Sequence, residues 1–348
     1  MASLADLPSI PPRAAVEVWT VADDEIVLHH ADGRVEVLDG LRPDVEVEVR
    51  GVGTVRTLAR PGGELLCRFG TVNDVHFGEL ECGRIEEYPD LGPVLIARPG
   101  DRPYPETMNA GAIGEMQAAS LDAVIVKGDL TCNGSLEEYE AFLAAYGVFG
   151  LRMHHVRGNH DAMHGLTYAA GQQRIELAGC TVALLDTVDP GRSGGTLDDD
   201  QLDWLDEVAV SADADRHVIA MGHHHPWDPA SNTRPDSYFG ISPTASEGLV
   251  AVLARRERIL GWFAGHTHRN RRRTFGALGD RPIVEVGCTK DFPGSWAEYR
   301  VFEGGVLQVH RRISTPAALA WSDGCRAMVG GLYPLYASGS LADRCFAF

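Results

Sequence analysis

Apolar and polar residues alternate along about the first sixty positions, and this period of two is typical of half-buried β-strands. The apolar positions of the pattern are Val16, Val18, Ile26, Leu28, Val35, Val37, Val45, Val47 and Val49. Asp32-Gly33 lies between two of these runs, where it favours a hairpin turn. We therefore expect a small antiparallel β domain over residues 1–63, joined to the rest of the chain by Pro61-Gly62-Gly63.

Beyond this join, short apolar runs alternate with helical patterns, which favours an α/β fold. Residues 123–126 contain no polar side chain, as expected of a strand buried on both faces. Weaker runs of the same kind cover 153–156, 182–185, 218–221 and 260–264. Ser135 and Glu138 form the pattern of a capping box, so a helix is expected to start there. Apolar spacing predicts two further helices, over 197–208 and 245–256.

The last part of the chain has a different pattern. The apolar runs at 296–301 and 306–310 predict the two strands of a hairpin, and the tail after them, which contains Gly and Tyr, predicts no particular element. We therefore expect a main α/β domain over 64–295 and a C-terminal hairpin and tail extension over 296–348.

The charge of the chain limits its partners. The 31 Lys and Arg residues are outnumbered by 49 Asp and Glu, which gives a formal net charge of -18. Such a balance disfavours nucleic acid and anionic membranes. It also repels a phosphate group, so any phosphoester substrate requires bound cations that reverse the field locally. The 44% hydrophobic and 23% charged fractions are ordinary for a globular protein.

The cysteines point to a reducing compartment. There are seven, and none lies in a Cys-x-x-Cys pair, so neither a thiolate zinc site nor a full disulfide framework is indicated. Pairing of Cys325 with Cys345 is the alternative that would signal an oxidising compartment. The first residues lack a basic segment followed by an apolar stretch, and no apolar run approaches ~18 residues. We expect a cytoplasmic location and no membrane association.

Residue types that bind metals follow five of the apolar runs. They are Asp74, His76, Asp129, Asn159, His160, His223, His266 and His268. Because strands of an α/β sheet direct their carboxyl ends at one crevice, these side chains are expected to meet in space. Two cations about 3.5–4 Å apart need a bridging carboxylate, for which Asp129 is suited. A mixture of oxygen and imidazole ligands suits Mn, Fe or Zn.

The motifs around these residues resemble those of the calcineurin-like metallophosphoesterase family. The five blocks are Asp74-Val-His76, Gly128-Asp129, Gly158-Asn159-His160-Asp161, Gly222-His223-His224-His225 and Gly265-His266-Thr267-His268. They appear in the family's order, within about residues 65–285. The resemblance implies a sandwich of two mixed β-sheets flanked by helices, with residues 64–295 as the catalytic domain.

The resemblance also implies roles for the ligands. The site would hold two divalent or mixed-valence metal ions. One would bind Asp74, His76, Asp129 and His268, and the other would bind Asp129, Asn159, His223 and His266. Solvent that bridges the ions would be deprotonated near neutral pH and would attack phosphorus. His160 would donate a proton to the leaving alkoxide or hydrogen-bond the phosphoryl oxygen, and Asp161 would orient it. Within the triple histidine, His223 is assigned because similar sequences carry the ligand there, with His224 as the alternative.

These features favour a metal-dependent phosphoesterase. The segment from Gly128 to Phe142 and the His-His-His-Pro block resemble class III cyclic-nucleotide phosphodiesterases, which suggests a small phosphodiester such as cAMP. A phosphomonoesterase, a nucleotide pyrophosphatase and a non-catalytic scaffold on the same fold are the alternatives. The N-terminal β domain or the tail could cap the pocket or build a homodimer. The arginines at 269 and 271–273 could attract an anionic substrate, but a charged strand edge is the commoner explanation.

Overall fold

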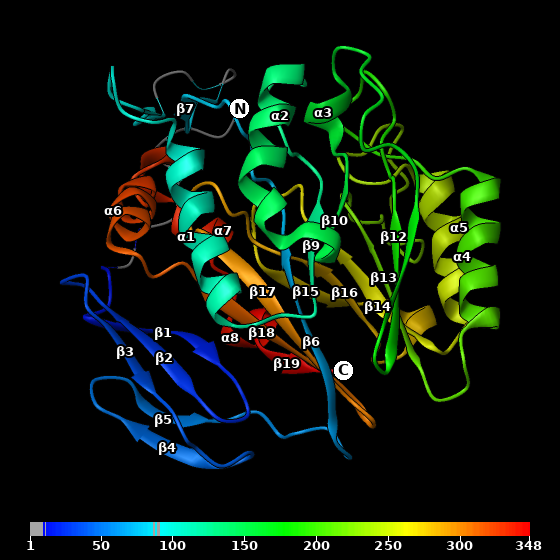
Figure 1. The fold of residues 1–348 in the computed structure, drawn as a ribbon, viewed down its shortest axis with the longest axis horizontal. Coiled ribbons are helices and arrows are strands. Elements are labelled where there is room, and N and C mark those ends of the chain that lie inside the picture. The colour runs from blue at the N-terminus through cyan, green and yellow to red at the C-terminus, as the bar shows by residue number, and fades with distance from the viewer. Residues whose placement is uncertain (1–9, 11, 86–87, 89–90) are drawn as a thin grey trace.

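Two six-stranded sheets pack face to face and carry helices on their outer faces in the computed structural model, which describes residues 10, 12–85, 88 and 91–348 (Figure 1). The first sheet has the order β10-β9-β6-β17-β18-β19. Its strands are β6 (Leu65–Val72), β9 (Ala123–Lys127), β10 (Met153–Val156), β17 (Ser295–Phe302), β18 (Gly305–Arg312) and β19 (Phe346–Ala347). β6, β9 and β10 run parallel, whereas the others pair antiparallel, so the sheet is mixed.

The second sheet has the order β11-β12-β13-β14-β16-β15. Its strands are β11 (Gln173–Leu177), β12 (Cys180–Leu185), β13 (His217–Gly222), β14 (Ile259–Ala264), β15 (Arg271–Thr274) and β16 (Pro282–Glu285). β12, β13, β14 and β16 are parallel, and the two edge strands are antiparallel to their neighbours. Aliphatic and aromatic side chains from both sheets, among them Phe69, Phe263 and Tyr299, fill the space between them.

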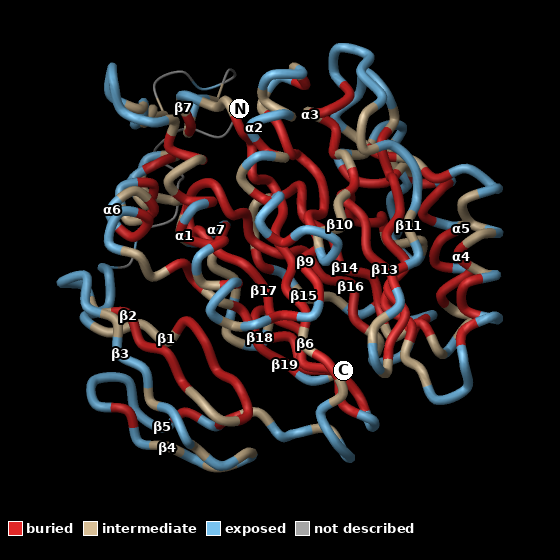
Figure 2. The backbone as a smooth tube through the Cα atoms, in the orientation of Figure 1, coloured by how far each residue is buried: buried red, intermediate tan, exposed pale blue. Residues whose placement is uncertain are grey.

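Helices cover both outer faces. α1 (Tyr104–Ala118), α2 (Leu136–Tyr146) and α6 (Pro316–Cys325) share one apolar core with the first sheet. α4 (Asp199–Ser211) and α5 (Pro243–Arg255) share another with the second sheet. Figure 2 shows the consequence: the central strands of the sandwich are buried, and the helices are exposed on their outer sides. Shorter helices are η2 (Gly147–Arg152), α3 (Asn159–Ala162), η3 (Gly276–Leu278), η4 (Val329–Gly331), α7 (Tyr333–Ala337) and α8 (Leu341–Arg344).

The N-terminal strands form two small antiparallel sheets beside the sandwich (Figure 1). One contains β1 (Val16–Val21), β2 (Ile26–His30) and β3 (Val35–Leu38), and the other contains β4 (Glu46–Val49) and β5 (Gly53–Arg56). The turn expected at Asp32-Gly33 joins β2 to β3. A third small sheet pairs β7 (Glu81–Cys82) with β8 (Leu95–Ile96).

The expected fold class is confirmed: two mixed sheets are flanked by helices, and an antiparallel sheet precedes them. The apolar runs at 123–126, 153–156, 182–185, 218–221 and 260–264 form β9, β10, β12, β13 and β14, and the C-terminal hairpin is β17 and β18. Ser135 and Glu138 form the capping box of α2. The domain boundaries stay predictions. The one between 295 and 296 falls inside β17, which pairs with β6 in the first sheet.

Two further findings concern the helices and the cysteines. None of the described helices is long and apolar enough to cross a lipid bilayer. All seven cysteines are free, including Cys325 and Cys345.

Candidate metal centre

Five strand ends converge at one edge of the sandwich. Asp74 and His76 follow β6, Asp129 follows β9, and Asn159 follows β10, all from the first sheet. The second sheet supplies His223 at the end of β13, and His266 and His268 after β14. Because all five strands present their carboxyl ends here, the two sheets build one site between them.

Five of these residues have a left-handed backbone. The φ angles are 52° at Asp74, 45° at His76, 49° at Asp129, 67° at His266 and 56° at His268. A non-glycine residue in this region is strained by about 1–3 kcal/mol, and such strain persists only where the surroundings hold it. Here the amides of Asp74 and His76 donate to the carbonyls of Gly128 and Asp129, at 3.1 and 3.0 Å. The loops that carry the ligands therefore hold each other in place.

Asp129 lies at the centre of the group. Its Oδ2 atom is 3.4 Å from His76 Nε2 and 3.3 Å from His223 Nε2, and its Oδ1 accepts the backbone N–H of His160 at 3.0 Å. The side chain is 2% exposed. One carboxylate thus touches imidazoles from both sides of the site, as a bridging ligand must.

Two glycines permit this packing. A Cβ atom on Gly128 would lie 2.5 Å from His223 Nδ1, and one on Gly158 would lie 2.2 Å from Asp129 Oδ1. Gly128 also has a φ of 90°, which other residues rarely adopt. Both positions therefore require glycine, because the side chain of His223 or Asp129 occupies the space that a larger residue would need.

One half of the site contains Asp74, His76 and His268. Potential ligand atoms of these three residues lie within 4.8 Å of one another, and His268 Nε2 is 3.5 Å from Asp74 Oδ1. The two imidazoles meet edge to face, with ring centroids 5.5 Å apart. This half contains the residues expected to form the first metal site together with Asp129, and the assignment stays a prediction.

The other half contains His223, Asn159 and His266. His223 Nε2 lies 3.2 Å from Asn159 Oδ1, and His223 Nδ1 bonds to the carbonyl of Lys127 at 2.9 Å. His266 Nε2 bonds to the carbonyl of Phe239 at 2.7 Å. Since a carbonyl only accepts, each of these rings carries a hydrogen on the nitrogen that meets the carbonyl, and the other nitrogen offers a lone pair to a metal ion when the ring is neutral.

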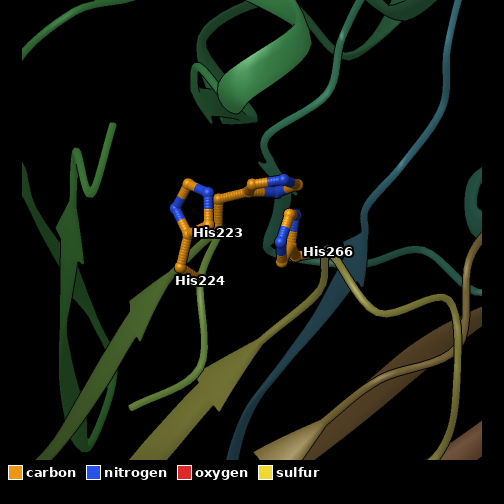
Figure 3. A group of neighbouring side chains, drawn as sticks. All are labelled: His223, His224 and His266. Atoms are coloured by element: carbon orange, nitrogen blue, oxygen red, sulfur yellow. The ribbon is translucent and has the colours of Figure 1, made fainter. Parts of the chain in front are cut away.

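His224 lies beside these rings. Figure 3 shows His223, His224 and His266 close together, and their ligand atoms also lie within 4.8 Å of one another. His224 Nδ1 pairs with the hydroxyl of Thr187 at 2.8 Å, and its buried Nε2 has no hydrogen-bond partner among the described residues. His223, in contrast, contacts both Asp129 and Asn159. These contacts favour His223 as the ligand, and the assignment stays a prediction.

Two carboxylates stand behind the histidines of the first half. His76 Nδ1 lies 3.1 Å from Glu79 Oε2, and His268 Nδ1 lies 3.7 Å from Asp291 Oδ2. Lys290 is 2.7 Å from Glu79 and 3.5 Å from Asp291, so one buried ammonium group joins both carboxylates. Such partners orient ligating imidazoles and raise their basicity. Sequence patterns did not identify Glu79, Lys290 or Asp291.

His160 and Asp161 come directly after the Asn159 ligand. The His160 ring lies 4.5 Å from that of His76, and its Nδ1 bonds to the Cys132 carbonyl at 2.7 Å, which leaves Nε2 available. The Asp161 carboxylate accepts the amides of Leu130, Thr131 and Gly158 at 3.0, 2.9 and 2.7 Å. No hydrogen bond joins the two side chains among the described residues.

Burial and charge perturb the pKa values of these groups. Burial lowers the pKa of the His223 imidazole, but the Asp129 and Asp74 carboxylates outweigh it and raise the pKa to about 9. Burial raises the pKa of Asp161, and Asp129 adds to this, so the pKa is about 6. Burial lowers the pKa of the neighbouring Lys127 to about 7.

The donor set fits two divalent cations. Asp74 and Asp129 are buried carboxylates, and the ring nitrogens of the buried His76 lie 3.1 and 3.4 Å from carboxylate oxygens of Glu79 and Asp129 without an aligned hydrogen bond to them. Buried carboxylates are costly unless a cation or another partner satisfies them. Oxygen and imidazole ligands are the types that Mn, Fe and Zn accept.

A cavity of about 540 Å³ opens beside the first half of the site. Its lining includes His76, His160 and His268. It also includes five residues of the C-terminal segment, Met328, Val329, Leu332, Tyr333 and Tyr336, which we call the tail wall. The volume is within the usual range for small-molecule sites.

Comparison with known proteins gives matches over the segment that contains these residues. A family model for calcineurin-like phosphoesterases matches residues 67–270, which contain all seven candidate metal ligands. The chain is 30% identical over 181 residues to CpdA, a 3',5'-cyclic adenosine monophosphate phosphodiesterase of Pseudomonas aeruginosa. The matched segment covers 50% of this chain and 64% of CpdA. It is 28% identical over 159 residues to a probable glycerophosphodiester phosphodiesterase, GpdQ, of Arcobacter nitrofigilis, with coverage of 42% and 57%. The chain thus spans less than two thirds of either relative.

Solved structures support the fold alone. A dimetal phosphatase from Danio rerio superimposes with a TM-score of 0.57 at 16% identity, over 72% of this chain and 98% of the other. The family match covers more than half of the chain, and the five motifs and the two-sheet sandwich agree with it. The chain therefore belongs to the calcineurin-like phosphoesterase family.

Proposed function

We propose that this protein hydrolyses a small phosphodiester with two metal ions bound at the candidate centre. The observation that carries the proposal is the position of Asp129, whose carboxylate touches His76 from one half of the site and His223 from the other. A shared carboxylate between two sets of imidazoles is the arrangement that a pair of divalent cations needs.

In this proposal Asp74, His76, Asp129 and His268 hold one ion, and Asp129, Asn159, His223 and His266 hold the other. The ions supply Lewis-acid activation of water and of the phosphoryl group. Lys127 and Phe239 keep the rings of His223 and His266 in the required tautomer through their carbonyls. Neutral Asn159 adds a ligand without adding charge.

His160 acts on the ester bond. His160 acts in its protonated, cationic form: the Cys132 carbonyl accepts the Nδ1 hydrogen, so the proton that the ring donates to the departing alkoxide is the one at Nε2, and the ring is then neutral. Asp161 acts through the backbone: it binds the amides at 130, 131 and 158, and thereby positions the loops that carry Asp129 and His160. Asp161 is thus a positioning residue.

A cyclic nucleotide is the first substrate candidate, because CpdA is named for cyclic adenosine monophosphate and matches this chain at 30% identity. A glycerophosphodiester is the second, favoured by the match to GpdQ. The net charge of -18 argues against nucleic acid. A scaffold that had lost catalysis would be expected to lack ligands, whereas every ligand position carries an appropriate side chain.

The test replaces the shared carboxylate. We expect Asp129→Ala to abolish manganese-dependent hydrolysis of bis-p-nitrophenyl phosphate and to lower the bound metal, measured by mass spectrometry, below the two ions per chain of the parent. Asp200→Ala changes an exposed carboxylate on α4 and is the matched control. Full metal content and activity in Asp129→Ala would refute the proposal, as would a parent protein without metal-dependent activity.

A further inference from the structure

The lining of the cavity beside the metal centre contains two chemically different groups of residues. His76, His160 and His268 belong to the metal centre. The tail wall is largely apolar because it contains Met328, Leu332 and Tyr333. Since His160 faces the cavity and is the proposed proton donor, the cavity lies where the departing alcohol of a substrate would be.

The tail wall is fixed against the metal loops. The Tyr336 hydroxyl donates to the carbonyl of Thr267, between His266 and His268, at 2.8 Å. The Tyr333 hydroxyl donates to Asp291 at 2.9 Å, and the Asn270 amide donates to the carbonyl of Ala337 at 3.0 Å. The wall is therefore present before substrate arrives. It lies outside residues 67–270, so it is not part of the segment matched by the family model.

The charged groups of the described cavity lining are already paired. Lys290 is 5% exposed and bonds to Glu79. Arg84 makes two hydrogen bonds to Glu81, at 2.6 and 3.0 Å. A second phosphate or carboxylate on the substrate would be repelled by the Glu79 and Glu81 carboxylates. Among the described lining residues, Lys290 and Arg84 are already paired with these carboxylates and would not compensate the repulsion. A flexible polyol would gain little from the apolar wall, because its hydroxyls would lose water without new partners.

We propose that the tail wall is a specificity subsite for the alcohol part of the substrate, and that it selects an uncharged aromatic or apolar group. This inference rests on the proposed function, since the phosphate must lie at the metal centre. A volume of about 540 Å³ is large enough for a ring of nucleobase or aryl size. The segment from Met328 to Tyr336 then determines which phosphoester reacts.

The test compares two phosphonates that are not hydrolysed and differ only in their apolar group. Phenylphosphonate and methylphosphonate are titrated into manganese-loaded protein by calorimetry. We expect the phenyl compound to bind at least about tenfold more tightly, because its ring is buried against the tail wall. Leu332→Asp should remove most of this difference.

Leu335→Asp is the matched control, since Leu335 is 50% exposed and does not line the cavity. Equal binding of both phosphonates to the parent would overturn the subsite and leave the proposed function standing. A phenyl preference that survives Leu332→Asp would also overturn it. Binding of neither phosphonate would refute the proposed function and the subsite together.

Discussion

Three histidines of the centre each have one ring nitrogen bonded to a backbone carbonyl. The partners are Cys132 for His160, Lys127 for His223 and Phe239 for His266. A carbonyl accepts and never donates, so each bond decides which nitrogen faces the site. The chemistry of these side chains is therefore set by main-chain groups, whose positions depend on the loops around them.

A single-residue prediction concerns His160. We expect His160→Ala to lower kcat for bis-p-nitrophenyl phosphate by about 10²–10⁴-fold, the usual contribution of a general acid. Metal content should not change, because the backbone N–H that bonds to Asp129 is retained. His164→Ala, at an exposed histidine nearby, is the control. Turnover equal to that of the parent would remove His160 from the mechanism.

Strand ends and helix caps set the geometry at the scale of elements. The parallel strands of both sheets deliver ligands to one edge, and α2 starts immediately after the loop that contains Asp129. Ser135 accepts the amide of Glu138 at 3.2 Å, while Glu138 Oε2 accepts the amides of Ser135 and Asn133. This capping box ends the loop between β9 and α2.

Removal of the cap should affect stability more than activity. We expect Ser135→Ala to lower the free energy of unfolding by about 1 kcal/mol, because the N-terminal amides of α2 lose an acceptor. Urea denaturation followed by circular dichroism measures this, with Ser237→Ala at an exposed serine as control. A change equal to that of the control would show that the cap contributes no stability.

Local patterns predicted the elements whose signals are local. The apolar runs and the Ser135 capping box identified the strands and α2, and the order of the five motifs indicated the candidate ligand positions, which stay predictions. α1 was not predicted: its buried residues include Met108, Ala112 and Met116, and Gly111 and Gly114 weaken its helical pattern.

Contacts between distant segments could not be predicted in the same way. Lys290 meets Glu79 across 211 residues of chain, and no short-range pattern indicates this pair. The helices of the tail pack on distant segments: α6 packs on α1, α8 lies against β1 and β15, and Tyr336 of α7 bonds to Thr267 near the metal centre. Tertiary packing of this kind overrides local propensity.

Buried ion pairs join the N-terminal sheet to the sandwich at the scale of the whole molecule. Arg300 on β17 bonds to Asp23 and Asp24 at 2.6 Å and to Glu25 at 3.0 Å, all in the turn between β1 and β2. The Glu298 side chain, which is 0% exposed, bonds to Arg300 on the same strand. It also forms salt bridges with Arg68 and Arg311, so one carboxylate accepts hydrogen bonds from three guanidinium groups.

Glu298 should make stability depend on pH. Burial alone would raise its pKa, but Arg311, Arg300 and Arg68 outweigh this and lower the pKa to about 2, below the ordinary value of 4.5. The ionised form is therefore favoured by folding. Its stabilisation is fully present above about pH 4.5 and is lost as the pH falls through about 2.

We expect Glu298→Gln to lower the free energy of unfolding at pH 7 by about 3–5 kcal/mol, the usual cost of breaking a buried ion pair. The gap between parent and variant should narrow as the pH falls from 4.5 towards 2, and urea denaturation at pH 7, 5 and 3 measures it. Glu207→Gln, at an exposed carboxylate of α4, is the control. If the difference in the free energy of unfolding between parent and Glu298→Gln did not change with pH, the lowered pKa of Glu298 would be contradicted.

The left-handed backbone at Asp74, His76, Asp129, His266 and His268 matters for protein engineering. Copying these five side chains onto the strand ends of another scaffold would fail, because ordinary strand termini do not point side chains in these directions. A successful graft would have to transplant the loops as well, together with the amides and carbonyls that hold them. The smallest part of this protein that could carry the metal site into another scaffold is thus the set of loops that hold one another through backbone hydrogen bonds.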